Sequence, residues 1–310
     1  MTTEQYRQLA STRGASAHFE HRVVRGLFAA AATIGLVLIF ILNPDAALSY
    51  ASTTQLFGAL RAPGEPAFIA GHRGDRAHFP ENTLPALQAV LDGDFDFVET
   101  DIQLSSDGVP VLMHDETVER TTNGAGLVGS LTAAELTALD AGSWYSYDFA
   151  YTPVPTLDQF LEIFQNSTKR GMLELKGIWT PEQVSIVTSL ILARGVQDRV
   201  VFAAFDFETL ESMREAAPVF KRIIIQRYLP SDPVGLLNRF GAIAVLTSAG
   251  SLERNPDAVR QLHEAGFGIV LYTLNGQATW TEALALGVDG IITDKPSSLD
   301  KWIAENAPGT

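Results

Sequence analysis

The segment GIVLYTLNGQATWTEALALGVDGIIT, Gly268–Thr293, shows most clearly how this chain folds. It begins and ends with short apolar runs, Gly268–Thr273 and Gly290–Thr293, and a helical pattern, Gln277–Ala285, lies between them. Gly287 follows the helical pattern, where a glycine commonly ends a helix. The segment therefore predicts a strand, a crossover helix and a second, parallel strand.

The same alternation runs through the chain from Ala67 onward. Further apolar runs lie at Phe68–Gly71, Phe97–Gln103, Met172–Lys176, Val200–Ala204, Arg222–Gln226 and Ala242–Leu246. Helical stretches between them include Thr83–Asp92, Pro181–Arg194, Phe207–Ala216 and Asp257–Ala265. Strands that are apolar throughout are typical of a parallel sheet buried on both faces. Eight such units in about 240 residues predict an α/β fold, a (β/α)8 TIM barrel over residues 67–305. A doubly wound open sheet is the alternative, but it would more often have five or six strands.

One long segment interrupts this alternation after the second strand. We place an insertion at residues 115–155, which contains a glycine-rich turn, Asn123–Gly126, and an aromatic stretch, Trp144–Phe149. Insertions after a strand of this barrel lie on the catalytic face, so we expect a lid or a substrate wall. An inert surface excursion is the alternative.

The amino-terminal region differs in kind from the rest. Four arginines and two glutamates give the tail, residues 1–25, a net charge of +2. Gly26–Leu42 follows without a charged side chain and is just long enough to cross a bilayer. We expect a signal anchor, with a cleaved signal or a buried helix as alternatives. Residues 43–66 are assigned to a linker. The expected location is therefore the cell membrane, with a single span and an extracytoplasmic catalytic domain; the alternative is secretion after signal cleavage.

Composition excludes several classes of function. The chain has 310 residues, 46% of them hydrophobic, and a formal net charge of −14. Binding to nucleic acid needs concentrated Lys and Arg, so we expect no nucleic-acid partner. The chain has no cysteine, which excludes a disulfide framework, a thiolate zinc site and a cysteine nucleophile.

Polar side chains gather at the ends of the first two predicted strands. His72 and Arg73 follow the first strand. Near the end of the second strand, Glu99 and Asp101 are two residues apart and so share one face. Two inward carboxylates repel each other and lose hydration, so they need a cation.

A turn and a returning arm follow the second strand. Ser105–Gly108 is a turn signal, after which the chain runs back toward His114. If Leu104 pairs with Val109, the register places Glu99 opposite His114. A second imidazole then lies beside the carboxylates.

The third strand adds a carboxylate and an ammonium group, Glu174 and Lys176, again two residues apart. Each polar residue taken alone could be structural, but together they meet at one mouth of the barrel. Carboxylate oxygens suit a hard divalent ion, and the cations suit an anion. The pattern predicts a metal-assisted site that processes an anion.

Four ordered motifs resemble the glycerophosphodiester phosphodiesterase family. They are GHRGDRAHFPENTLPAL (Gly71–Leu87), FVETDIQLSSDGVPVLMHDETVERTTNG (Phe97–Gly124), LELKG (Leu173–Gly177) and GVDGIITDKP (Gly287–Pro296). The resemblance covers about Ala67 to Trp302. It implies metal-dependent hydrolysis of a small-molecule glycerophosphodiester to sn-glycerol 3-phosphate and an alcohol on a TIM barrel.

The resemblance also implies a role for each matching residue. His72 and His114 would be the acid/base pair. Glu99, Asp101 and Glu174 would hold Ca²⁺ or Mg²⁺, and Arg73 and Lys176 would bind the phosphate. Glu81 and Asn82 would mainly shape the first loop, with Glu81 also considered as a ligand. Tyr272 stands where many members have tryptophan, and it would form a substrate wall.

Two other functions remain open at this point. A lysophospholipase D-type enzyme would act on membrane lysolipids, which suits the apolar amino-terminal segment and the aromatic insertion. A catalytically silent cell-envelope binding protein would use the same barrel without turnover. The sequence gives no indication of which proteins the chain binds.

Overall fold

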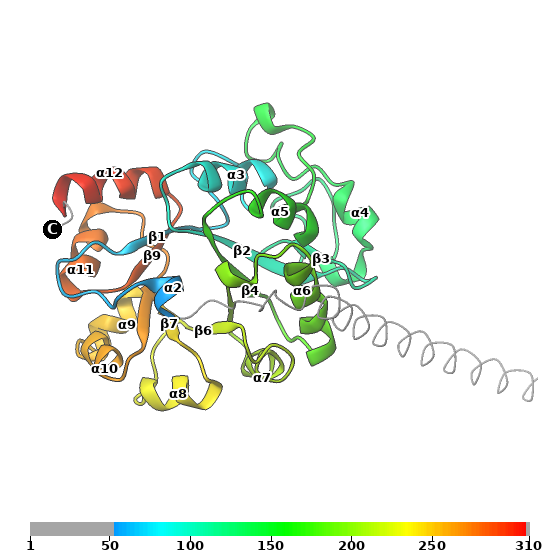
Figure 1. The fold of residues 1–310 in the computed structure, drawn as a ribbon. Coiled ribbons are helices and arrows are strands. Elements are labelled where there is room, and N and C mark those ends of the chain that lie inside the picture. The colour runs from blue at the N-terminus through cyan, green and yellow to red at the C-terminus, as the bar shows by residue number, and fades with distance from the viewer. Residues whose placement is uncertain (1–52, 308–310) are drawn as a thin grey trace, which may run out of the picture. The chain divides into compact units, whose positions relative to one another are not determined.

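The computed structural model describes residues 53–307, which form a closed barrel of eight parallel strands (Figure 1). The barrel strands are β1 (Phe68–Gly71), β2 (Phe97–Leu104), β4 (Arg170–Leu175), β5 (Val200–Ala204), β6 (Lys221–Gln226), β7 (Ala244–Thr247), β8 (Gly268–Leu271) and β9 (Gly290–Thr293). Strand β1 pairs with both β9 and β2, which closes the ring. This closure confirms the predicted TIM barrel and excludes the open sheet.

The helices surround the strands in chain order, as Figure 1 shows. They are α3 (Leu84–Asp92), α5 (Leu157–Phe164), α6 (Pro181–Ala193), α7 (Phe207–Ala216), α8 (Pro233–Phe240), α9 (Ala249–Arg254), α10 (Ala258–Glu264), α11 (Gln277–Leu286) and α12 (Pro296–Asn306). Local signals set their ends. Thr180 caps α6 through a capping box with Gln183, and Gly287 ends α11 in the left-handed conformation, as the sequence predicted for the end of α11.

The apolar core has two layers. The outer layer, between strands and helices, includes Leu87, Phe160 and Phe202. The inner layer fills the barrel with side chains such as Phe97 and Val270. Both layers are buried, so each strand is apolar on its two faces, which explains why the strands read as continuous apolar runs.

A short helix, α2 (Thr53–Phe57), packs into the inner layer. The ring of Phe57 stacks on that of Phe68, the first residue of β1, with 5.3 Å between ring centroids. Arg170, the first residue of β4, donates a hydrogen bond to the carbonyl of Leu56. Helix α2 therefore closes the amino-terminal end of the barrel. Residues 53–66, which the sequence assigned to a linker, include this packed element.

The returning arm after β2 has a different register from the predicted one. Strand β3 (Pro110–Leu112) is antiparallel to β2, and Leu104 pairs with Pro110, not with Val109. The turn is one residue tighter, because Ser105 already pairs with Val109 and Gly108 adopts a positive φ of 80°. Glu99 and His114 are therefore not cross-strand partners, and the predicted pairing is wrong by one residue.

The insertion after β3 contains the short helix α4 (Ala133–Thr137) and two 3-10 turns, Val128–Ser130 and Tyr147–Phe149. The predicted membrane or signal segment, residues 26–42, lies outside the described residues. Within residues 53–307, no helix has the length and apolarity to span a bilayer.

Candidate active site

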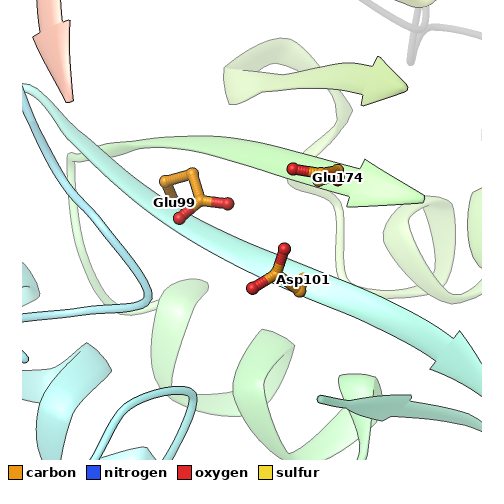
Figure 2. Close-up of side chains that lie close together, drawn as sticks. All are labelled: Glu99, Asp101 and Glu174. Carbon is orange, nitrogen blue, oxygen red and sulfur yellow. The ribbon is translucent and has the colours of Figure 1, made fainter. Parts of the chain in front are cut away.

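Three carboxylates meet at the carboxyl ends of two neighbouring strands. Glu99 and Asp101 lie on β2 and Glu174 lies on β4, where Asp101 and Glu174 are register partners (Figure 2). One oxygen of each of the three groups lies within 4.8 Å of the others, and all three residues are buried. The structure thus brings together the three acidic residues that the sequence singled out.

The crowding of these groups opposes their ionisation. Burial, followed by the charges of Asp101 and Glu174, raises the pKa of Glu99 well above its ordinary value. Burial and Asp101 likewise raise the pKa of Glu174 to about 7, although Lys176 opposes this shift. Without a bound ion, the protein therefore places more negative charge at this site than its own cationic side chains neutralise.

Asp101 is the member of the group that remains charged. Burial would raise its pKa, but Arg73 and then Lys176 outweigh that effect and lower it. Nδ2 of Asn82 donates to Oδ2 of Asp101 over 2.9 Å, and Oδ1 of Asn82 accepts from the hydroxyl of Thr100 over 2.8 Å. Asn82 therefore orients Asp101 directly. This contact with the carboxylate group is additional to the predicted role of Asn82 in shaping the first loop.

The donor set fits a hard divalent cation. It offers only carboxylate oxygens, which Ca²⁺ and Mg²⁺ prefer. Its three groups repel one another at their present spacing, and a doubly charged ion among them would relieve that repulsion. Glu99, Asp101 and Glu174 are the residues that would hold such an ion.

Two cations border the carboxylates. Nε of Arg73 lies 3.2 Å from Oδ2 of Asp101, and its backbone N–H donates to Oε2 of Glu99 over 2.8 Å. Nζ of Lys176 lies 2.7 Å from Oε1 of Glu174 and 3.7 Å from Oδ1 of Asp101. Two positive charges therefore lie directly beside the three carboxylates.

His72 lies just after β1, and its imidazole is held by the carboxylate of Asp294, which lies just after the neighbouring strand β9. Its Nδ1 lies 2.6 Å from Oδ1 of Asp294, and Oδ2 of Asp294 accepts from Nδ2 of Asn275 over 2.7 Å. Burial lowers the pKa of His72, although the hydrogen bond to Asp294 opposes the shift. The contact at Nδ1 leaves Nε2 of His72 available for proton transfer.

His114 is held in the same way. Its Nδ1 lies 2.6 Å from Oδ1 of Asp115, and burial lowers its pKa. Arg120 holds Asp115 in turn, with 2.5 Å between Nε and Oδ2, and also reaches Glu81 over 2.7 Å. The negative charge of Asp101 acts to raise the pKa of both His114 and His72, so both imidazoles lie within electrostatic range of the carboxylate group.

Glu81 is surrounded by arginines. Arg73, Arg76 and Arg120 lie 2.6, 2.9 and 2.7 Å from its carboxylate oxygens. Burial would raise its pKa, but these partners, Arg120 first, lower it to about 2. Glu81 therefore stands outside the group of three carboxylates and ties the first loop to the insertion.

Tyr272 follows β8 and forms one wall of the mouth. Its ring packs edge-on against Phe205, which follows β5, with 6.3 Å between ring centroids. Nζ of Lys176 lies 5.6 Å from the centroid of the Phe205 ring. Tyr272 and Phe205 thus form an aromatic pair beside Lys176, and the predicted role of Tyr272 as a substrate wall stays a prediction.

Sequence reasoning missed the partners of the two histidines. Asp115 directly follows His114, so the His-Asp dipeptide was a usable signal. Asp294 lies within the quoted GVDGIITDKP motif, but only closure of the barrel brings it to His72. Arg120 carried no local signal.

Known proteins are similar to this chain in sequence. Residues 72–298 match the Glycerophosphoryl diester phosphodiesterase family. The Bacillus subtilis protein YhdW is 35% identical over 243 residues, which cover 76% of this chain and 97% of that protein. A glycerophosphodiester phosphodiesterase of Caldanaerobacter subterraneus is 30% identical over 233 residues, covering 74% of this chain and 95% of the relative.

Solved structures share the barrel. A phosphodiesterase of Oleispira antarctica, in complex with the product sn-glycerol-3-phosphate, has 27% identity and a TM-score of 0.73, covering 77% of this chain and 97% of its own. A glycerophosphodiester phosphodiesterase of Agrobacterium tumefaciens has 30% identity and a TM-score of 0.68, covering 76% and 100%.

Proposed function

Because the chain belongs to the glycerophosphoryl diester phosphodiesterase family, we propose that it hydrolyses glycerophosphodiesters to sn-glycerol 3-phosphate and an alcohol by metal-dependent histidine catalysis. The observation that carries this proposal is the group Glu99, Asp101 and Glu174, bordered by two imidazoles that are each held at Nδ1. The product bound to the Oleispira antarctica relative supports the choice of substrate.

Each part of the site has a task in this reaction. A divalent ion, Ca²⁺ or Mg²⁺, held by the three carboxylates would neutralise charge on the phosphate oxygens. Arg73 and Lys176 bind the non-bridging oxygens and stabilise charge that builds up in the transition state. One histidine takes a proton from the nucleophile, and the other protonates the leaving alkoxide. Each such transfer is typically worth about 10²–10⁴ in rate.

A product assay tests this function. The full chain is incubated with glycerophosphocholine, and sn-glycerol 3-phosphate is measured enzymatically. We expect release by the wild type, and loss of release by His72→Ala and by His114→Ala. Full activity in both variants would refute the assignment of the acid/base pair. Tight binding of the diester without turnover, in protein loaded with metal, would instead identify a binding protein.

A second candidate substrate is a lysolipid, and one observation favours it. Tyr147 and Tyr151, on the insertion, are each 90% exposed, and Trp144 beside them is 40% exposed. Tyr and Trp side chains suit the boundary between water and lipid. Lysophosphatidylcholine and its deacylated headgroup diester, assayed side by side, separate the two substrates. Faster turnover of the lysolipid would favour the second candidate.

The proposal extends to location. The apolar segment, residues 26–42, anchors the chain in the cell membrane, and the basic tail before it remains in the cytoplasm, which leaves the barrel outside. Protease accessibility of the intact cells tests this arrangement. Cleavage of the barrel by an external protease is expected, whereas protection until the cells are lysed would contradict it.

A further inference from the structure

Two arginines on the catalytic rim have no acidic partner. Arg227 follows β6, and Arg254 ends α9, which follows β7. Across residues 53–307, neither guanidinium forms an ion pair, and each instead lies against an aromatic ring. By contrast, Arg73 and Arg120 at the same mouth are neutralised by carboxylates. Arg227 and Arg254 therefore keep their positive charge available.

The two loops that carry these arginines are tied together. The hydroxyls of Ser248 and Thr247 donate to the carbonyl of Arg227 over 2.6 and 3.4 Å. The backbone N–H of Leu229 donates to the hydroxyl of Ser251 over 2.8 Å, and Ser251 is buried. The loops after β6 and β7 thus form one connected surface.

Both guanidinium groups lie against the same aromatic ring, that of Tyr228. Cζ of Arg254 lies 4.0 Å from the centroid of the Tyr228 ring, and Cζ of Arg227 lies 5.9 Å from it. Arginine stacks readily on an aromatic face, and such stacking restricts its rotamers while its N–H donors stay free at the edge. Tyr228 therefore presents two oriented cations to solvent.

The strand register places this pair beside the reaction site. Gln226, Thr247 and Leu271 are neighbours on β6, β7 and β8, so Arg227, Ser248 and Tyr272 occupy the next level above them. The backbone N–H of Tyr272 donates to the carbonyl of Thr247 over 3.0 Å. The charges of both Glu174 and Arg227 act on the Tyr272 hydroxyl. Tyr272 is thus close to both Arg227, which lies at the same level of the barrel rim, and Glu174.

We propose that Arg227 and Arg254 form a second anion subsite, which selects glycerophosphodiesters whose leaving alcohol carries a further phosphate group. This inference rests on the proposed function, because it concerns the alcohol side of the same substrate. Guanidinium groups pair with phosphate oxygens through two parallel hydrogen bonds. A residual charge of −16 on residues 26–310 would otherwise repel such a polyanion, so local cations are needed to bind it.

Matched substrate pairs test the subsite. The first pair is glycerophosphoglycerol and bis(glycerophospho)glycerol, which differ by a second phosphodiester unit. The second pair is glycerophosphoinositol and its 4-phosphate, which differ by a phosphate monoester. The measured quantity is the ratio of kcat/KM within each pair, using the full chain. We expect the wild type to favour the phosphate-bearing member of at least one pair roughly tenfold.

Variants assign this preference to the two arginines. Arg227→Ala and Arg254→Ala should each lower the ratio severalfold, mainly by raising KM for the phosphate-bearing member. Arg239→Ala is the matched control, because Arg239 also stacks on a ring, that of Phe240 at 4.9 Å, but lies in the last turn of α8, at the opposite face of the barrel. This control should keep the wild-type ratio.

Each outcome has a defined meaning. A preference confined to the diester pair identifies an oligomeric substrate, and one confined to the monoester pair identifies a phosphorylated headgroup; both support the subsite. A wild-type ratio near one in both pairs, or a ratio that survives Arg227→Ala, would overturn it. Failure of the proposed function gives a different result, because no substrate would then release sn-glycerol 3-phosphate.

Discussion

Nδ1 of His72 lies 2.6 Å from Oδ1 of Asp294, and this contact joins residues that are 222 positions apart in the chain. Gly71 and Thr293 are register partners in β1 and β9, so closure of the barrel brings the two following segments together. The contact fixes the orientation of the imidazole. The geometry of the proposed acid/base site therefore depends on the same strand pairing that closes the fold.

We expect Asp294→Asn to lower kcat/KM by roughly 10²-fold, because the variant loses the charge that orients and stabilises the His72 imidazolium. The negative charge also raises the pKa of His72, so the limb of the pH–rate profile that reports His72 should move to lower pH. Steady-state kinetics across pH measure both effects. Asp257→Asn, at an exposed position before α10, is the control. An unchanged profile in Asp294→Asn would contradict the role.

Arg120 is predicted to act through Asp115 on His114. Arg120→Gln should lower kcat/KM by roughly 10-fold to 100-fold, which is typical when the support of a functional side chain is removed. Without the guanidinium charge, Asp115 would attract a proton on His114 more strongly, so the pKa of His114 should rise. Arg120→Lys should recover part of the activity. A variant with lower activity but the wild-type pH profile would indicate a purely structural role.

The strands were predictable because their signal is local. The runs Phe68–Gly71, Val200–Ala204 and Gly290–Thr293 coincide with β1, β5 and β9, since burial on both faces leaves continuous apolar sequence. The hairpin register was not predictable, because a turn signal does not show how many residues the turn contains. Ser105 pairs with Val109 and shortens the turn by one residue.

The site was predictable where spacing alone placed its residues. A spacing of two along β2 puts Glu99 and Asp101 on one face, and the structure has them in one group. The partners of Glu81 were not predictable, because Arg120 reaches it from the insertion, 39 positions away. Such contacts depend on the path of a loop in the folded protein, and they produce no periodic pattern in the sequence.

Because the carboxylates are crowded, we expect the stability of the metal-free protein to depend on pH. The pKa of Glu174 is about 7 in the fold against an ordinary value of 4.5, so the folded state binds more protons than the unfolded state between these values. This residue should therefore make the metal-free protein less stable as pH rises from 4.5 to 7. The Tm of Glu174→Gln minus that of the wild type, measured in EDTA, should increase over this range. A difference independent of pH would contradict the shift.

Helix α2 should stabilise the barrel without acting on catalysis. Phe57→Ala removes a buried ring that stacks on Phe68, and it should lower the free energy of unfolding by about 3–5 kcal/mol. Because α2 lies at the end opposite the site, kcat of the folded protein should stay near the wild-type value. Tyr147→Ala, at a 90% exposed position, is the control and should change stability by no more than about 0.5 kcal/mol. Urea unfolding measures both variants.

Dependence on a divalent ion is the most direct test of the carboxylate group. The full chain is stripped with EDTA, dialysed, and assayed for release of sn-glycerol 3-phosphate before and after Ca²⁺ or Mg²⁺ is added. If the three carboxylates hold an ion that the reaction needs, we expect negligible release from the stripped protein and recovery on addition of one of these ions, with no recovery in Asp101→Asn. Undiminished release from protein shown to be free of metal would contradict it.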